Sequence, residues 1–285
     1  SSNWSPAGVP TVNDVVIIDK STDFTVSINA GNQYMASYSK LGNTLGGTAT
    51  LDVSGGTLTD ATSSIFIIGY ESPGVLSVSG DSILNLNSGG TGGNGSIWLG
   101  YFSTGTININ SGTINTCGLQ GGIASDSHSI INMTGGTINV GYMFWPWAQG
   151  ASADMHLDGG TLNVGYLFGP SWAAFDATEP NVNWDIGGGT LIIDGNITSL
   201  PGVTAYDGNG ILLYEYNSTY NKTTITSTGR PYYVDVNGND NNPGTISQPF
   251  ATLEKARDTI RNLSPLPNGG ITVFIRGGKY FRSSE

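Results

Sequence analysis

Short runs of alternating hydrophobic and polar residues recur along the first 229 positions of the chain. In the runs 51–53, 107–109 and 131–133, a hydrophobic residue stands on each side of Asp or Asn. Because successive side chains of a strand point to opposite faces, this alternation predicts strands with Leu, Ile and Val on one face and Asn, Asp or His on the other. Residues 15–18 and 24–28 predict two further strands.

A glycine-rich phrase separates these strands and repeats along the chain. It consists of Gly-Gly-Thr and an aliphatic residue, with degenerate copies, and its marker glycines are Gly55, Gly80, Gly112, Gly135, Gly159 and Gly188. The markers follow one another at steps of 25, 32, 23, 24 and 29 residues. One predicted strand precedes each marker and another follows it. Glycine lets the chain turn there with a positive φ that a Cβ atom would oppose.

A third strand completes most of these units. It is predicted at 66–68, 97–99, 143–145 and 167–168, whereas the unit after Gly112 has only a weak counterpart around 121–123. A unit of about 25 residues with three short strands cannot bury its apolar face alone, but stacked units pair each strand with its copies above and below. We therefore predict an all-β fold, a right-handed parallel β-helix of about 6–8 coils with one short C-terminal helix. A β-sandwich is the alternative.

Charge divides the chain near residue 230. Residues 1–229 carry three basic and 16 acidic side chains, a net charge of −13, whereas residues 230–285 carry a net charge of +2. The division predicts a β-helical domain at 1–229, whose last part, 196–229, has lost the repeat and is expected to cap the stack. A surface this acidic repels nucleic acid, anionic lipid and polyuronates, so a neutral partner is expected. Cys117, the single cysteine, can form no internal disulfide.

The last 56 residues follow a different pattern. A strand at 232–234 precedes a polar Asn-Gly-Asn-Asp turn, and Pro249-Phe250 leads into a helix predicted at 253–263 with Thr252 as its cap. A strand at 271–275 and Gly277-Gly278-Lys279-Tyr280 follow. This order resembles the segment that caps the first coil of pectate-lyase-like parallel β-helix enzymes. Residues 230–285 are therefore expected to be the start of such a second domain or a terminal cap of the first stack.

Few residues suit catalysis. His128 and His156 are isolated, and the residues Asp52, Asp154, Asp158 and Asp185 fit β-helix corners better than a glycosidase pair, whose carboxylates lie about 5–10 Å apart. The resemblance implies calcium and an Arg or Lys base for a lyase, but the first arginine is Arg230. The acidic stretch 235–240 is interpreted as a turn because Asp240 stands where a calcium loop needs glycine. We predict no catalytic residue and no cofactor, with a calcium requirement left open.

Aromatic residues are the better candidates for a site. Tyr70, Tyr101, Trp145, Trp147 and Trp172 follow the third strand of successive units, and Trp98 has the outward parity between Ile97 and Leu99. Neighbouring coils are about 4.8 Å apart, close to the length of a sugar ring along a glycan. The stretch 145–147 is expected to be exposed, because adjacent bulky rings and a proline rarely all point inward. These six aromatic residues are the predicted carbohydrate-binding residues.

The combination of glycine-rich repeats, few basic residues and edge aromatics resembles β-helical carbohydrate-binding modules that accompany xylan-degrading enzymes of bacteria. The resemblance implies a secreted or cell-surface monomer that binds a neutral plant polysaccharide, xylan first, and targets a linked catalytic domain. Two alternatives stay open: a glycoside hydrolase or polysaccharide lyase of the same fold, and a structural adhesin or passenger scaffold. No partner nucleic acid or membrane is expected.

Overall fold

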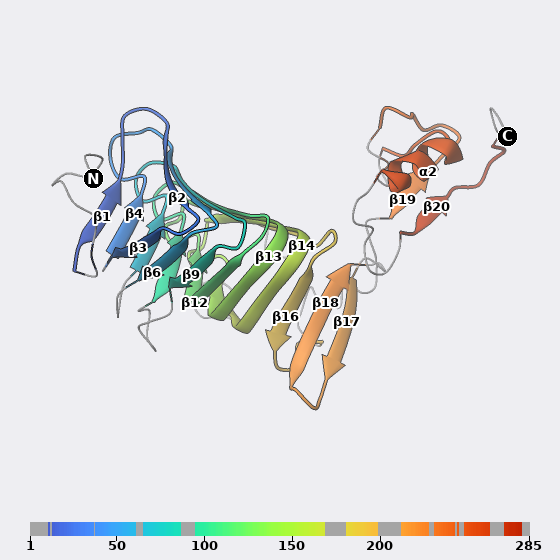
Figure 1. Ribbon diagram of the computed structural model, residues 1–285. Coiled ribbons are helices and arrows are strands. Elements are labelled where there is room, and N and C mark those ends of the chain that lie inside the picture. Colours follow the sequence, from blue (N-terminus) through green and yellow to red (C-terminus); the bar gives the residue numbers. More distant parts are fainter. Residues whose placement is uncertain are drawn as a thin grey trace.

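The chain forms a β-solenoid of about six turns, followed by a small unit with one helix (Figure 1). The computed structural model describes residues 11, 13–36, 38–60, 65–86, 95–168, 181–198, 212–227, 231–242, 244, 248–262 and 271–280. Among these residues, no helix has the length and apolar character needed to cross a bilayer. The predicted parallel β-helix is confirmed, and the described part of the chain contains one short helix near its C-terminal end.

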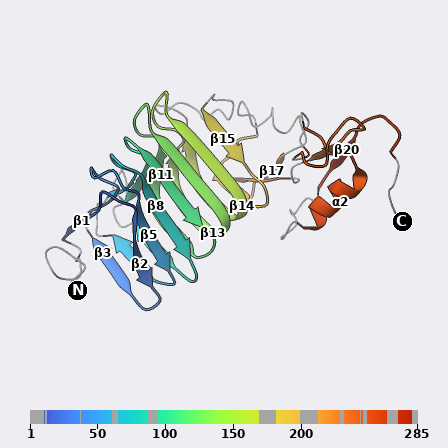
Figure 2. The same cartoon turned by 90° about the horizontal axis from the view of Figure 1, so that it is seen from above.

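Strands of successive turns pair in parallel and form three faces. The first face (Figure 2) contains β2 (Phe24–Asn29), β5 (Ala49–Ser54), β8 (Gly74–Ser79), β11 (Thr104–Ile109), the starts of β13 (His128–Phe144) and β14 (Ser152–Phe168), and β15 (Val182–Asp185). The second contains β3 (Gln33–Ala36), β6 (Thr57–Asp60), β9 (Ile83–Leu86), β12 (Thr113–Gly121), the middles of β13 and β14, and β16 (Thr190–Asp194). The third contains β1 (Val15–Ile18), β4 (Tyr38–Leu41), β7 (Ile65–Ile68), β10 (Ser96–Leu99) and the ends of β12, β13 and β14.

The solenoid encloses aliphatic ladders. On the first face, Leu51, Leu76, Ile107, Ile131 and Met155 lie in register on five successive turns, and each is at most 1% exposed. Burying such a side chain contributes about 1.5–3 kcal/mol, so the ladders supply the main driving force for stacking. The inward parity predicted from the alternation is therefore confirmed.

Asparagine ladders run outside the core on the second and the first face. Asn163, Asn139 and Asn115 each donate from Nδ2 to the Oδ1 of the asparagine one turn earlier, at 2.8–2.9 Å, and the last acceptor is Asn85. Asn132 donates to Asn108 in the same way on the first face. The outward Asn columns expected from the sequence thus hold neighbouring turns together by side-chain hydrogen bonds as well as by the backbone.

Two glycines explain why the third strand of the unit after Gly112 is nearly invisible in the sequence. That strand is present as 118–121, the end of β12, and it pairs with β10 and β13. A Cβ atom on Gly118 would lie 2.2 Å from the Tyr142 ring, and one on Gly121 would lie 2.5 Å from the Trp145 ring. Glycine occupies both positions because the next turn places a large ring over each of them, which removes the hydrophobic signal.

An antiparallel hairpin follows the last parallel turn. Strands β17 (Leu212–Asn217) and β18 (Lys222–Ser227) form it, and β18 pairs antiparallel with β16 at the edge of the second face (Figure 1). An unpaired edge of a sheet is a template for aggregation, and the hairpin covers this one. The expected cap in 196–229 is thus an added hairpin, and residues 199–211 lie outside the described part.

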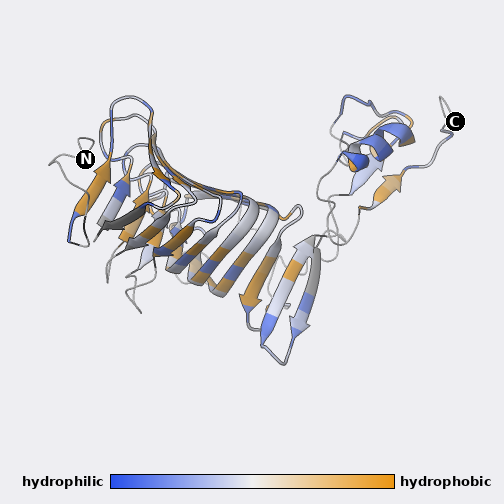
Figure 3. Ribbon diagram, viewed as in Figure 1, coloured by the Kyte–Doolittle hydropathy of each residue, from blue (hydrophilic) through white to orange (hydrophobic). Residues whose placement is uncertain are grey.

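The C-terminal unit has a core of its own. Strands β19 (Tyr232–Val234) and β20 (Val273–Ile275) pair in parallel, α2 (Leu253–Arg261) packs beside them, and Val234, Phe250 and Ala256 are buried between these elements. Figure 3 shows a largely hydrophilic helix beside a hydrophobic β20. The helix begins at the predicted residue, and Leu263 lies outside the described residues.

The acidic stretch 235–240 is a turn, as interpreted from the sequence. Asp235 accepts hydrogen bonds from the backbone N–H of Asn237 and from the Arg276 guanidinium, and these two interactions hold the pKa of Asp235 below its usual value. The Asp240 carboxylate accepts from the backbone N–H groups of Ala251 and Thr252 and from the Thr252 hydroxyl. Thr252 in turn caps α2 by accepting from the N–H of Lys255.

Removing the Asp240 carboxylate should loosen the C-terminal unit alone. Asp240→Ala removes three hydrogen bonds to a charged acceptor, and we expect a loss of about 2 kcal/mol. Amide hydrogen exchange should speed up in α2 and stay unchanged in β13 and β14. The control is Asp258→Ala, because the ion pair of Asp258 with Arg257 is exposed and such pairs contribute little to stability. Equal exchange rates in the Asp240 variant and the wild type would contradict this role.

Candidate aromatic binding site

The corners after β7 and β10 present aromatic side chains on two adjacent turns. Gly69 and Gly100 open these corners with φ of +78° and +66°. A Cβ atom on Gly69 would lie 2.3 Å from the carbonyl oxygen of Thr104, so only glycine allows the close approach. Tyr70 and Tyr101 come directly after these glycines, and the N–H of Tyr101 donates to the carbonyl of Gly69. The backbone therefore brings the two tyrosines into one column.

Four rings form a single cluster at this position. The ring centroids of Tyr70 and Tyr101 are 5.2 Å apart, and Trp98 stacks on Tyr101 at 5.5 Å with an interplanar angle of 22°. Phe102 meets Tyr101 edge to face at 4.5 Å and Tyr70 at 5.8 Å. We call these four residues the aromatic cluster. Such edge-to-face and offset pairs are the arrangements that aromatic rings favour.

The aromatic cluster rests on the outer side of the third face. In register there, Lys40, Ile67 and Trp98 follow one another on three turns. Ile67 has the outward parity and lies outside the core cluster, yet it is only 1% exposed, so neighbouring outer side chains cover it. The ammonium of Lys40 lies 3.6 Å from the centroid of the Tyr70 ring, a cation–π contact. This cation–π contact therefore adds to the interactions that hold Tyr70 in the aromatic cluster.

The members of the cluster differ in exposure. Phe102 is 54% exposed, whereas Tyr70, Trp98 and Tyr101 are half-buried. The indole Nε1 of Trp98 is buried and has no hydrogen-bond partner among the described residues. Trp98 thus serves as the base on which Tyr101 stacks, and Phe102 with the outer parts of the tyrosines is what a ligand could contact.

The expected exposure of Trp145 is wrong. Its side chain is 0% exposed and belongs to the core, with its ring beside Gly121. The glycine in the preceding turn creates the space that the indole fills, so two adjacent bulky residues do not both have to face solvent. Trp147 is half-buried, and Trp172 lies outside the described residues.

Among the described residues, the aromatic row expected across successive units is interrupted after two turns. The backbone hydrogen bond that links Tyr101 to Gly69 has counterparts from Ile123 to Gly100 and from Ala148 to Gly122. The column of Tyr70 and Tyr101 therefore continues into Ile123 and Ala148. The backbone N–H of Trp147 instead donates to the carbonyl of Gly121. Trp147 therefore stands in its corner one residue before the position that Tyr70 and Tyr101 occupy in theirs. In the described part of the chain, the rings therefore gather in one compact cluster on two turns.

The titratable residues outside the cluster make no second centre in the described part of the chain. His128 Nε2 lies 2.8 Å from Asp154 Oδ2 on the first face, with about a third of each side chain exposed. His156 stands in register with Asn132, in an outward column as predicted. The described residues contain no group of three or more His, Cys, Asp or Glu side chains that would hold a metal ion.

No protein-family model, curated protein or solved structure matches this chain. The aromatic cluster offers exposed ring faces and edges. Its neighbouring cation, Lys40, already contacts a ring, and no carboxylate is among the residues that form the site. Such a surface suits binding of an apolar face of a neutral ligand more than acid–base chemistry. The sequence did not point to Lys40 or Phe102 as site residues. Phe102 directly follows Tyr101, which was predicted. Lys40 lies in register with Trp98, two turns earlier on the third face.

Proposed function

We propose that the chain is a non-catalytic module that binds a neutral plant polysaccharide, xylan first, through the aromatic cluster. The observation that carries this proposal is the contact of four rings on two adjacent turns, with Phe102 standing exposed above the others. Aromatic rings present flat apolar faces that pack on the C–H faces of sugar rings, and their quadrupole favours the slightly positive hydrogens there.

The charge of the site favours a neutral ligand. Lys40, the cation of the site, contacts the Tyr70 ring, and residues 1–229 carry a net charge of −13. A polyuronate would meet net repulsion from this acidic surface. Xylan suits the exposed rings because its pyranose units lack the exocyclic hydroxymethyl group, so both faces of each unit are open to stacking.

The spacing of the turns limits how much of a chain the cluster would hold. Neighbouring turns are about 4.8 Å apart, close to one sugar unit. Tyr70 and Tyr101 lie on adjacent turns, so the cluster would contact one or two units of a longer chain. Affinity for an isolated site of this size is expected to be modest, and a polymer would gain through repeated encounters with its many equivalent units.

Affinity electrophoresis tests the proposal against its two alternatives. Gels would contain xylan, mixed-linkage β-glucan, pectin or no polymer, with reducing ends and unsaturated products assayed in parallel. Retardation by xylan without products is the expected result. Product release would favour an enzyme, and equal mobility in all gels would leave the structural scaffold.

A further inference from the structure

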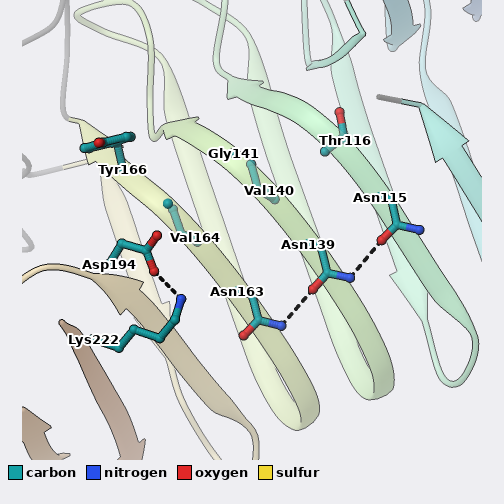
Figure 4. Close-up of a pocket in the computed structure, with 11 residues that line it drawn as sticks. Asn115, Thr116, Asn139, Val140, Gly141, Asn163, Val164, Tyr166, Asp194 and Lys222 are labelled. Carbon is teal, nitrogen blue, oxygen red and sulfur yellow. Dashed lines mark hydrogen bonds and ion pairs between the residues drawn. The ribbon is translucent and has the colours of Figure 1, made fainter. Parts of the chain in front are cut away.

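A groove lies at the C-terminal end of the longer asparagine ladder, on a different part of the solenoid from the aromatic cluster (Figure 4). Its volume is about 370 Å³, within the usual range for small-molecule sites. The lining residues that matter here are Asn115, Asn139, Asn163, Tyr166, Asp194 and Lys222. The first three come from successive turns of the second face, and the last two from β16 and β18.

The asparagine ladder has a direction. All three hydrogen bonds run from the Nδ2 of one turn to the Oδ1 of the preceding turn, so the amide dipoles align. The next residue in register after Asn163 is Ile192, whose side chain offers no donor. Within the described ranges, no donor reaches Asn163 Oδ1. Aligned hydrogen bonds polarise one another, which makes this terminal oxygen a strong acceptor beside the groove.

The ladder also leaves hydrogen-bonding capacity along its length. An asparagine side chain has two N–H donors and two carbonyl lone pairs. Each bond in the ladder uses one donor of one residue and one lone pair of the next. Asn139 therefore retains one N–H group and one lone pair, and Asn163, whose Oδ1 accepts no bond in the ladder, retains one N–H group and two lone pairs that a ligand in the groove could use.

The remaining walls supply a ring and two opposite charges. Tyr166 is 67% exposed, follows Gly165, and lines the groove together with the Asp194–Lys222 ion pair (Figure 4). Both members of the pair are nearly half exposed, so each keeps hydrogen-bonding capacity toward solvent. Their charges cancel, so the groove disfavours a net charge on its ligand.

We propose that this groove binds a single neutral polyhydroxylated ring, a pyranose sugar. Hydroxyl groups both donate and accept, and the groove offers partners of both kinds: Asn163 Oδ1 and Asp194 can accept, whereas Lys222 and the ladder N–H groups can donate. The C–H face of the ring would lie against Tyr166. This second site does not depend on the aromatic cluster and takes free sugars rather than only polymers.

The test titrates the whole chain with free D-xylose or D-glucose. Binding is monitored in ¹H–¹⁵N spectra through the side-chain amide resonances of the asparagines. The expected result is saturable shifts of the Asn139 and Asn163 Nδ2 resonances with a millimolar dissociation constant. Tyr166→Ala should weaken binding at least tenfold, and Asn163→Leu, which removes the terminal acceptor, should do the same. Because Tyr166 is exposed, its variant is expected to keep the melting temperature of the wild type.

A matched control tests whether sugar binding belongs to this groove. Tyr220→Ala removes a similarly exposed tyrosine outside the groove, and it should leave the sugar-induced shifts of Asn139 and Asn163 as in the wild type. Absence of saturable shifts with either sugar would overturn the groove proposal and leave the xylan proposal standing. Shifts that persist in both Tyr166→Ala and Asn163→Leu would place sugar binding elsewhere and overturn it as well.

Discussion

Replacement of Trp145 by alanine is expected to lower the free energy of unfolding of the solenoid by about 3–5 kcal/mol. The indole is 0% exposed and fills the space beside Gly121 in the turn before it. Truncation would leave a void between two turns, and because repeat proteins are stabilised by the contacts between neighbouring units, the loss falls on the interface that links them. Urea unfolding followed by circular dichroism would measure the change.

A second tryptophan provides the comparison for this prediction. Trp147 is half-buried two residues later, and Trp147→Ala should cost clearly less than Trp145→Ala. If Trp145→Ala kept wild-type stability, the indole would not be a core residue. Gly121→Ala should also destabilise the fold, since its Cβ atom would lie 2.5 Å from the same ring.

Truncating the exposed rings of the aromatic cluster is expected to weaken xylan binding by about ten- to a hundredfold, or about 1.4–2.7 kcal/mol. Phe102→Ala removes the ring that is 54% exposed, and Tyr101→Ala removes the ring that contacts the other three members. Calorimetric titration with soluble xylo-oligosaccharides would give the association constants. Tyr101→Ala should be the more damaging of the two because it also frees Trp98 and Tyr70 from their stacking partner.

The contributions of the ring and of bulk hydrophobicity can be separated. Phe102→Tyr keeps a flat ring and should bind nearly as well as the wild type, whereas Phe102→Leu keeps an apolar side chain and should bind weakly. Tyr220→Ala, an exposed tyrosine of the β17–β18 turn, should bind normally. Undiminished affinity in both Phe102→Ala and Tyr101→Ala would remove the aromatic cluster from the binding surface.

The solenoid could be predicted because its determinants are local. A hydrophobic residue at every second position assigns each side chain to the inside or the outside within a few residues, and glycine marks the corners. The structure puts positive φ at Gly55, Gly80 and Gly112, as the repeat predicts, and at Gly136 and Gly160, the second glycines of their pairs, whereas the marker Gly188 has no positive φ. The strand at 118–121 was harder to predict, because its residue types depend on the register between turns. Gly118, for example, leaves room for the Tyr142 ring of the next turn.

The site was predicted only in part for the same reason. Outward parity correctly placed Trp98 outside the core, and the corner position brought Tyr70 and Tyr101 together. The burial of Trp145 depends on a glycine 24 positions earlier, which no local rule reveals. The groove of Figure 4 depends on Lys222, which returns on an antiparallel strand, so the parallel repeat gave no indication of it.

A crystal structure of the chain with xylohexaose would show directly whether the aromatic cluster binds xylan. At least one xylose unit should lie with its C–H face against Phe102, Tyr101 or both, and the crystal should contain no cleaved product. Xylohexaose bound only at a surface that excludes these rings, or a chain that takes up none at saturating concentration, would contradict this proposal.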